Sequence, residues 1–298
     1  MAVRFGLVGT GYWARTVHGA GLAAHPGVEL AGVWGRDPGR TADAAAELGT
    51  APVPTFEQLL DEVDAVAFAV PPTVQAPLAL RAAGSGRHLL LDKPTALDPG
   101  EARELADAAE QSGVGSVVFF TSMFDLGRRD WAAGVRAAGD WDGAIGFWMG
   151  SLDTPGSPYA NSPWRREQGS LWDSLPHAVS LLEATLGTIG AVTARGGHRD
   201  TVHLITEHPG GATGTVTGSL LTPEGARRSS FDVWGPRGTS SVPDSGDSST
   251  AYRVAIDELL TQVDRAKPGH PYDVRYGAHV VDLLAAAQRQ VEAARRPR

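Results

Sequence analysis

A glycine-rich stretch near the start of the chain, GLVGTGYWA, has the spacing of a dinucleotide-binding loop. Gly9, Gly11 and Ala14 match G-x-G-x-x-G/A directly after an apolar run. The first glycine permits a tight turn, the second lets the backbone approach a diphosphate, and the alanine keeps helix and strand close. Glycine-rich turns also follow strands for structural reasons alone, but this position favours the nucleotide interpretation. The other loop residues expected to line the cofactor site are Thr10, Tyr12 and Trp13.

A lysine and an aspartate–histidine pair are the other residues whose types suit proton transfer. Lys93 ends an apolar run in the sequence LLLDKP, where a lone lysine is most often an ordinary solvated charge. Asp173 and His177 stand four residues apart, so on a helix they would share one face. The alternative is purely structural: Asp173 would stabilise the first turn of a helix, and His177 would pack under a sheet. The residues by themselves leave these alternatives open.

The end of the second expected strand indicates which dinucleotide binds. An NAD site usually places Asp or Glu there to bind both ribose hydroxyls. Here the sequence is VWGRDP, with Gly35 and Arg36 where the acid and its successor would stand. Arg36, supported by Arg40, can pair with a 2′-phosphate, whereas Asp37 would need a local shift to act as the acid. We therefore expect NADP in preference to NAD.

The first part of the chain alternates apolar runs with amphipathic stretches. The expected strands cover residues 3–9, 28–34, 65–70, 88–92 and 115–120, and the expected helices cover 12–24, 38–48, 73–84 and 98–112. Nearly continuous hydrophobicity is typical of strands covered on both faces, and the alternation predicts right-handed crossovers. The expected fold class is α/β, with a doubly wound parallel Rossmann domain over residues 1–121.

After about residue 122 the strands are separated mostly by turns. The expected strands cover 145–153, 190–198, 201–208, 212–222 and 229–242, and the expected helices cover 171–186, 251–266 and 273–295. Several runs alternate with period two, which indicates a sheet with one covered face. Residues 122–298 are predicted to form an α+β domain with a mainly antiparallel open sheet. This domain would bind substrate and join subunits into a homodimer or homotetramer.

The composition excludes several classes of protein. A net charge of −8 and the lack of a sustained basic run argue against nucleic-acid binding. The chain has no cysteine, which excludes disulfides and thiolate sites, and no pattern suggests a metal. No run of about 18 apolar residues offers a membrane span, and the N-terminus lacks signal-peptide features. We expect a cytoplasmic protein whose partner is a small-molecule substrate.

Motifs along nearly the whole chain resemble those of the Gfo/Idh/MocA family, which includes glucose–fructose oxidoreductase and inositol dehydrogenase. AVPPTVQAPLALRAAGSGRHLLLDKP is similar to the segment from a T-P-N-like turn to the E-K-P motif. SPWRREQGSLWDSLPHAVSLL is similar to the W-R stretch that leads into D-x-G-x-H, and WGPRGT to a late G-x-x-G-T turn. Together, in order and at compatible spacings, these matches are fairly specific.

The resemblance implies a role for each residue that matches. Lys93, in the Asp-Lys-Pro version of E-K-P, would be the acid/base beside the nicotinamide, and the bond before Pro94 would be cis. His177 would assist proton transfer, and Asp173 would bind a substrate hydroxyl or hold a partner in place. The further cofactor contacts that it implies are Val70, Pro71, Pro72, Gln75 and Asp92. The implied substrate contacts are Trp164, Arg165 and Met123.

Besides Asp92, which replaces the Glu of E-K-P, seven positions depart from the family pattern: Pro72, Gln75, Ser122, Met123, Leu175, Pro176 and Ser180. Three of them surround His177, where Leu175 replaces a glycine, Pro176 directly precedes the histidine, and Ser180 stands where an acid is frequent. These departures are compatible with hydride transfer, but they put a standard sugar or inositol substrate in doubt.

The chain is therefore expected to be an NAD(P)-dependent oxidoreductase acting on CH–OH groups. It would transfer a hydride between nicotinamide and the hydroxyl or carbonyl carbon of a small polar, sugar- or polyol-like substrate. Two alternatives stay open: a reductase of a non-sugar ketone or imine, and a catalytically silent NAD(P)-binding sensor or partner module. The joint presence of Lys93, Asp173 and His177 opposes the silent protein, which has no need of all three.

Overall fold

The apolar runs of the first part of the chain form a parallel sheet in the computed structural model, which describes residues 2–265 and 268–295. The strand order is β2-β1-β3-β4-β5, and every neighbouring pair is parallel. The strands are β1 (Val3–Val8), β2 (Val28–Trp34), β3 (Ala65–Phe68), β4 (His88–Asp92) and β5 (Ser116–Phe119). Each strand lies within the range expected from the sequence, so the predicted Rossmann sheet is confirmed.

Helices connect and flank these strands. They are η1 (Ala14–Gly19), α1 (Ala20–Ala23), α2 (Pro38–Glu47), α3 (Phe56–Glu62), α4 (Pro72–Gly84), α5 (Pro99–Gln111), α6 (Thr121–Phe124) and α10 (Ser248–Arg265). The start of α5 shows the local cause: Asp98 Oδ1 accepts hydrogen bonds from the backbone N–H groups of Gly100 and Glu101, and Pro99 occupies the first turn. The sequence did not predict α3, because seven residues are too few to show a helical period.

The order of the strands places helices on both faces of the sheet. In the sheet, β2 lies on one side of β1, whereas β3, β4 and β5 follow one another on the other side. Because the crossovers between parallel strands are right-handed, η1 and α1 lie on the opposite face from α4 and α5. Helix α10 contacts η1, α1, β4 and β5, and it therefore covers the same face as η1.

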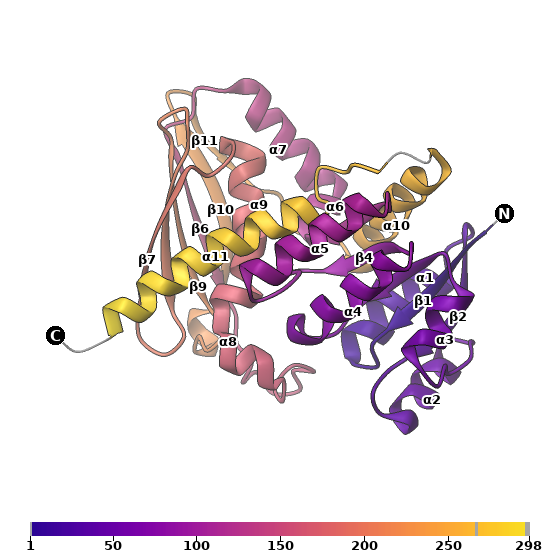
Figure 1. Cartoon of the computed structure of the whole chain (residues 1–298). Coiled ribbons are helices and arrows are strands. Elements are labelled where there is room, and N and C mark those ends of the chain that lie inside the picture. The colour runs from indigo at the N-terminus through magenta and orange to yellow at the C-terminus, as the bar shows by residue number, and fades with distance from the viewer. Residues whose placement is uncertain (1, 266–267, 296–298) are drawn as a thin grey trace. The chain divides into compact units, whose positions relative to one another are not determined.

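The second sheet is mixed, with the order β11-β10-β6-β9-β8-β7. Its strands are β6 (Gly143–Met149), β7 (Ala191–Gly196), β8 (Val202–Glu207), β9 (Thr213–Ser219), β10 (Arg228–Gly235) and β11 (Gly238–Ser241). The prediction of a mainly antiparallel sheet is confirmed, since only β6 and β9 pair in parallel among these strands. Figure 1 shows these strands in pink to orange, with α9 (Leu175–Leu186) against the sheet, where it contacts β6 and β9.

The other helices of the later part of the chain are α7 (Leu126–Ala138), α8 (Pro163–Asp173), η2 (Glu224–Ala226) and α11 (Val274–Arg295). The sequence predicted one helix over 171–186, but α8 and α9 are separate and meet at Ser174. Pro176 explains the break: it has no N–H to donate, and its ring would clash with the carbonyl of Trp172 in a continuous helix.

Asp200 ties α8 to the end of β9. Its carboxylate accepts hydrogen bonds from Ser170 N (3.2 Å), Ser219 Oγ (2.7 Å), Leu220 N (2.6 Å) and Leu221 N (3.1 Å). Hydrogen bonds to an ionised acceptor are stronger than neutral ones. This single side chain therefore fixes the helix whose last residue is Asp173.

The chain divides into two compact units that are not consecutive in sequence. The first comprises Met1–Asp125 and Gly246–Val281, and the second comprises Leu126–Ser245 and Asp282–Arg298. The sequence analysis assigned everything after residue 121 to the second domain, whereas residues 246–281 pack with the first unit. The described helices include none that is both long and apolar enough to cross a membrane.

Candidate cofactor and catalytic site

The glycine loop lies at the point where the crossovers of the first sheet change direction. Loops after β1 and β3 meet there, because a Cβ on Gly9 would come within 2.5 Å of Ala69 O. Gly9 also has φ +135°, a conformation that side-chain-bearing residues avoid. Around a Cβ added to Gly11, by contrast, no atom lies within 4 Å. The backbone is thus open to a diphosphate at the position where open α/β sheets bind nucleotides, and these residues fit a dinucleotide.

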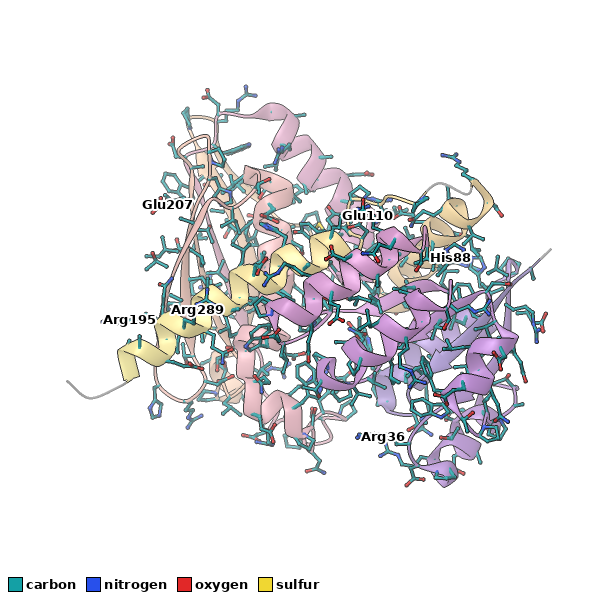
Figure 2. The ribbon with its side chains drawn as sticks, viewed as in Figure 1. Arg36, His88, Glu110, Arg195, Glu207 and Arg289 are labelled. Atoms are coloured by element: carbon teal, nitrogen blue, oxygen red, sulfur yellow. The ribbon has the colours of Figure 1, made fainter. Side chains whose placement is uncertain are left out.

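The end of β2 has no room for an acidic side chain at residue 35. A Cβ on Gly35 would lie 2.7 Å from Thr10 Cγ2 and 2.9 Å from Thr41 Oγ1. Arg36 is exposed, and Figure 2 shows its side chain directed away from the ribbon. Asp37 caps α2, since its Oδ1 accepts a hydrogen bond from Arg40 N at 2.9 Å. Both Arg36 and Asp37 are exposed, but the Asp37 carboxylate is engaged in capping α2, whereas the Arg36 guanidinium is open to a ligand.

A buried glutamine holds the loop that contains Lys93. Gln75 Nε2 donates to the backbone oxygens of Asp92 (2.8 Å) and Pro94 (3.1 Å), and its Oε1 accepts from Asp92 N at 3.0 Å. The Lys93–Pro94 peptide is cis, as the resemblance implied. Gln75 was expected to contact the cofactor. In the structure the nitrogen and the oxygen of its buried amide both bind the backbone beside Lys93, which is half-buried.

A cluster of buried polar side chains lies behind Asp92. His18, in η1, is fully buried, and its Nε2 lies 3.8 Å from Asp92 Oδ2. The ring of Tyr252, in α10, lies 4.2 Å from the His18 ring between centroids. Burial lowers the pKa of His18 to about 3 and raises that of Tyr252 well above its usual range. Because burial outweighs the attraction of the nearby carboxylate, His18 is neutral, and the 3.8 Å contact is not an ion pair.

In the second unit an arginine is held against the predicted substrate residues. Arg165 Nε lies 3.3 Å from Asp173 Oδ2, and the guanidinium carbon lies 4.8 Å from the Trp164 ring centroid and 4.5 Å from that of Tyr159. Both members of the ion pair are mostly buried. The structure thus joins Arg165, Trp164 and Asp173 into one group, in which the charge of Arg165 is already balanced by Asp173.

The remaining predicted residues differ in accessibility. His177 is half-buried in the first turn of α9, and its carbonyl accepts a hydrogen bond from Ser180 Oγ at 3.0 Å. Met123, expected near substrate, is fully buried, and its sulfur accepts a hydrogen bond from Tyr272 Oη at 3.2 Å. This placement favours packing for Met123. Lys93 belongs to the first unit, whereas Asp173 and His177 belong to the second.

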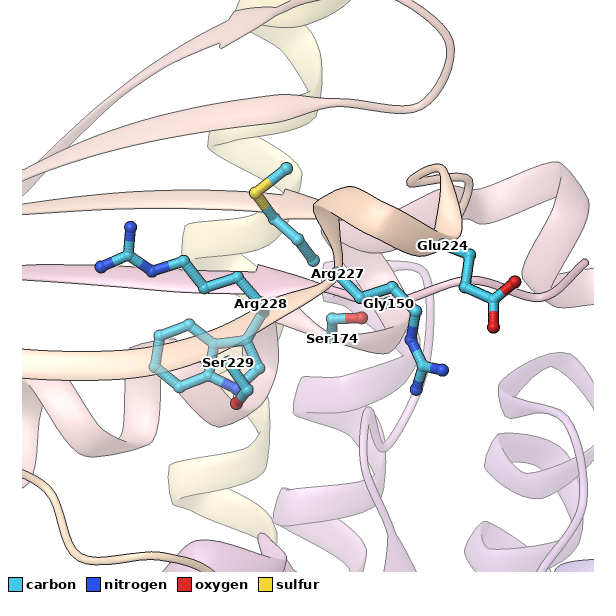
Figure 3. A pocket seen from close by; sticks show the side chains of 8 residues that line it. Gly150, Ser174, Glu224, Arg227, Arg228 and Ser229 are labelled. Atoms are coloured by element: carbon cyan, nitrogen blue, oxygen red, sulfur yellow. The ribbon is translucent and has the colours of Figure 1, made fainter. Parts of the chain in front are cut away.

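A pocket of about 510 Å³ opens at the end of β6, beside the junction of α8 and α9. Its lining residues are Trp148, Met149, Gly150, Ser174, Glu224, Arg227, Arg228 and Ser229. Figure 3 shows the side chains of Arg227 and Arg228 directed to opposite sides, with Ser174 between them. Arg228 lies over the Phe147 ring at 4.2 Å, whereas Arg227 makes no side-chain hydrogen bond or ion pair with the described residues. Ser174 directly follows Asp173.

Sequence reasoning missed His18, Tyr252 and the clamping role of Gln75. The first two are more than two hundred residues apart in sequence, so no local pattern relates them. In the described part of the chain, no three His, Cys, Asp or Glu side chains gather as metal ligands would.

The sequence matches two family models. Residues 3–120 match GFO_IDH_MocA, described as an oxidoreductase family with an NAD-binding Rossmann fold, and residues 143–241 match the GFO/IDH/MocA C-terminal domain. A similar protein is dTDP-3,4-didehydro-2,6-dideoxy-alpha-D-glucose 3-reductase of Streptomyces antibioticus. It is 28% identical over 302 residues, which cover 96% of this chain and 85% of that protein.

Solved structures share the fold along the whole chain. The WlbA dehydrogenase of Bordetella pertussis, in complex with NADH and UDP-GlcNAcA, has a TM-score of 0.85 at 21% identity, with 99% of this chain and 98% of that chain covered. A myo-inositol dehydrogenase from Corynebacterium glutamicum has a TM-score of 0.82 at 17% identity, with 100% of both chains covered.

Proposed function

The chain belongs to the Gfo/Idh/MocA family of oxidoreductases with an NAD-binding Rossmann fold, and on that premise we propose that it transfers a hydride between a nicotinamide cofactor and a sugar- or polyol-like substrate. The observation that carries the proposal is the open glycine loop at the switch point of the first sheet, with Lys93 two strands away at the same edge. Carboxyl ends of parallel strands share one edge, where such sheets bind their ligands.

The residues of the chain supply proton transfer and alignment, and the nicotinamide supplies the redox chemistry when bound. Lys93 is the acid/base: it donates a proton to the substrate oxygen during carbonyl reduction and accepts one during alcohol oxidation. His177 assists this transfer. Asp173, whose carboxylate is held by Arg165, accepts a hydrogen bond from a substrate hydroxyl.

NADP is the preferred cofactor in this proposal. The support is the exposed guanidinium of Arg36 together with the lack of space for an acid at Gly35. Arg36→Ala is expected to raise KM for NADPH at least about tenfold, which corresponds to about 1.4 kcal/mol of lost binding. KM for NADH should change little, and equal losses for both cofactors would refute the assignment.

A nucleotide-linked sugar is the substrate class that we infer within the family. The reductase of Streptomyces antibioticus bears a dTDP-linked sugar in its name, and WlbA was solved with UDP-GlcNAcA. The pocket beside Ser174 supports this inference, because Arg227 has no ion-pair partner in the described chain and suits a phosphate.

The open face of the second sheet is the surface that we propose joins subunits. Ile145, Ile205 and Trp234 are 42%, 47% and 44% exposed. Ile145 and Ile205 both pair with Thr215, so their side chains share one face. Burying this face against a second copy removes apolar surface from water. Light scattering should therefore find a dimer or tetramer that Ile205→Glu dissociates, and a wild-type monomer would contradict the proposal.

Turnover separates the oxidoreductase from a silent NAD(P)-binding protein. The wild-type chain is titrated with NADPH and NADH and then assayed with polyols, sugars and nucleotide-linked sugars. Lys93→Met should bind dinucleotide normally and lose turnover, whereas Arg195→Met, which removes an exposed cation of β7, should change neither. Dinucleotide binding without turnover on the whole panel, and without any effect of Lys93→Met, would favour the silent protein.

A further inference from the structure

The polar atoms buried behind Asp92 have no partners that explain their burial. Neither ring nitrogen of His18 has a hydrogen-bond partner in the structure, and the same holds for the hydroxyl of Tyr252. A buried polar atom left without a partner costs about 1–3 kcal/mol. A core that needed only packing would be more stable with apolar side chains at both positions. Their presence next to the Asp-Lys-Pro segment therefore points to a role outside packing.

The backbone around His18 is adapted to place the imidazole there. His18 lies in η1, a π-helical segment of six residues that directly follows the glycine loop. Such segments insert one extra residue into a helical turn, and they occur frequently at functional sites because they redirect a side chain at a cost in stability. Gly21 contributes as well, since a Cβ there would come within 2.7 Å of Tyr252 Cδ1.

Asp92 connects the imidazole to the backbone of Lys93. One carboxylate oxygen, Oδ1, accepts a hydrogen bond from Lys93 N at 2.8 Å. The other, Oδ2, is the atom that faces His18 Nε2 at 3.8 Å. That distance is beyond a hydrogen bond, but such contacts often tighten when ligands bind. The carboxylate therefore lies between the buried imidazole and the residue assigned the acid/base role.

We propose that His18 is a positioning residue for Lys93: its Nε2–H directs Oδ2 of Asp92 and so keeps Oδ1 on the Lys93 backbone. Tyr252 packs on the imidazole and fixes the plane of its ring. The groups that face His18 are Asp92 from β4, Tyr252 from α10, Phe119 from β5 and Trp13 from the glycine loop. This inference rests on the proposed function of Lys93, but it predicts a structural effect that can be measured without turnover.

The kinetic test compares two substitutions of His18. His18→Leu removes the donor, whereas His18→Gln retains an N–H near the position of Nε2. We expect His18→Leu to lower kcat about ten- to a hundredfold, because small misplacements of reacting groups cost rates of this size, with KM for dinucleotide nearly unchanged. His18→Gln should restore most of the loss. Equal losses in both variants, or wild-type kcat in His18→Leu, would overturn the proposal.

The matched control is His25→Leu. His25 is also buried in the first unit, and its Nε2 lies 3.0 Å from Asp257 Oδ1, so this substitution likewise removes a buried imidazole beside a carboxylate. It should lower stability and leave kcat of the folded protein unchanged. A matching loss of kcat in His25→Leu would mean that the effect at His18 is one of general destabilisation, and would overturn the proposal.

A second measurement is independent of turnover. The chain contains two lysines, Lys93 and Lys267, so reductive methylation with ¹³C gives two lysine signals that Lys267→Arg assigns. The Lys93 signal should move in His18→Leu and stay in His18→Gln and His25→Leu. If the wild-type protein turns over no substrate, the proposed function fails while this measurement still decides the positioning role. An unmoved Lys93 signal in His18→Leu refutes that role.

Discussion

Acid pH should destabilise this protein through His18 in particular. The side chain is fully buried, and burial lowers its pKa from 6.5 to about 3. Unfolding returns the imidazole to water, where it binds a proton as soon as the pH falls below about 6.5. Because the unfolded chain then holds one more proton than the folded chain, the free energy of unfolding decreases as the pH falls from about 6.5 toward about 3.

The size of this effect follows from the two pKa values. Between about pH 7.5 and about pH 5, a histidine that titrates near 6.5 when unfolded and near 3 when folded costs about 2 kcal/mol of stability. The half-buried His88 and the buried His208 also have pKa values lowered mainly by burial, and they add to the acid sensitivity of the whole chain. They are present in wild type and variant alike, so their contributions cancel in a difference.

The assay is urea unfolding of wild type and His18→Gln over this pH range. The free energy of unfolding of wild type should fall by about 2 kcal/mol more than that of the variant, which cannot titrate at residue 18. An exposed histidine provides the control: His198→Gln should follow the wild-type curve. Parallel curves for wild type and His18→Gln would refute the reasoning, because they would mean that residue 18 binds a proton in the folded protein.

Three further substitutions test other parts of the structure. Asp200→Asn should lower the free energy of unfolding by about 2–3 kcal/mol in urea titrations, because one carboxylate accepts four hydrogen bonds; an effect under about 0.5 kcal/mol would contradict this account. Gly9→Ala should weaken NADPH binding in calorimetry and lower the melting temperature, since φ is +135° and the added Cβ would meet Ala69 O; unchanged binding would argue against the loop as the cofactor site. Arg227→Ala should raise KM for a nucleotide-linked sugar about tenfold without changing KM for an uncharged sugar, with Arg237→Ala as the exposed control; equal effects on both substrates would exclude phosphate binding at the pocket.

The local sequence was sufficient for the first sheet and for the approximate places of most strands in the second. Strands such as β4 show as unbroken apolar runs, and helices such as α5 carry their own capping residues, so neighbours in sequence decide their form. Lys93 was placed at a strand end for the same reason. Helix α3 and the break at Ser174 were not predicted: the first is short, and the second follows from a proline inside an otherwise helical pattern.

Several features depend on contacts between distant residues. Gln75 matched a cofactor position in sequence, yet its amide binds the backbone of Asp92 and Pro94, and Met123 lies in the core beneath Tyr272. Burial is a property of the packed chain, and a residue type at a motif position does not reveal which way its side chain is used. The roles of these side chains therefore became visible only with the tertiary structure.

By itself, the sequence determined the family and the two kinds of sheet, and it predicted which residues suit proton transfer, because periodicity and motif spacing are local. The tertiary structure alone decided that residues 246–281 pack with the first unit and bring Tyr252 against His18, behind Asp92. The physical reason is that the sequence of a helix shows which of its faces is apolar but does not show which other element packs against that face. That choice is made when the whole chain buries its apolar area.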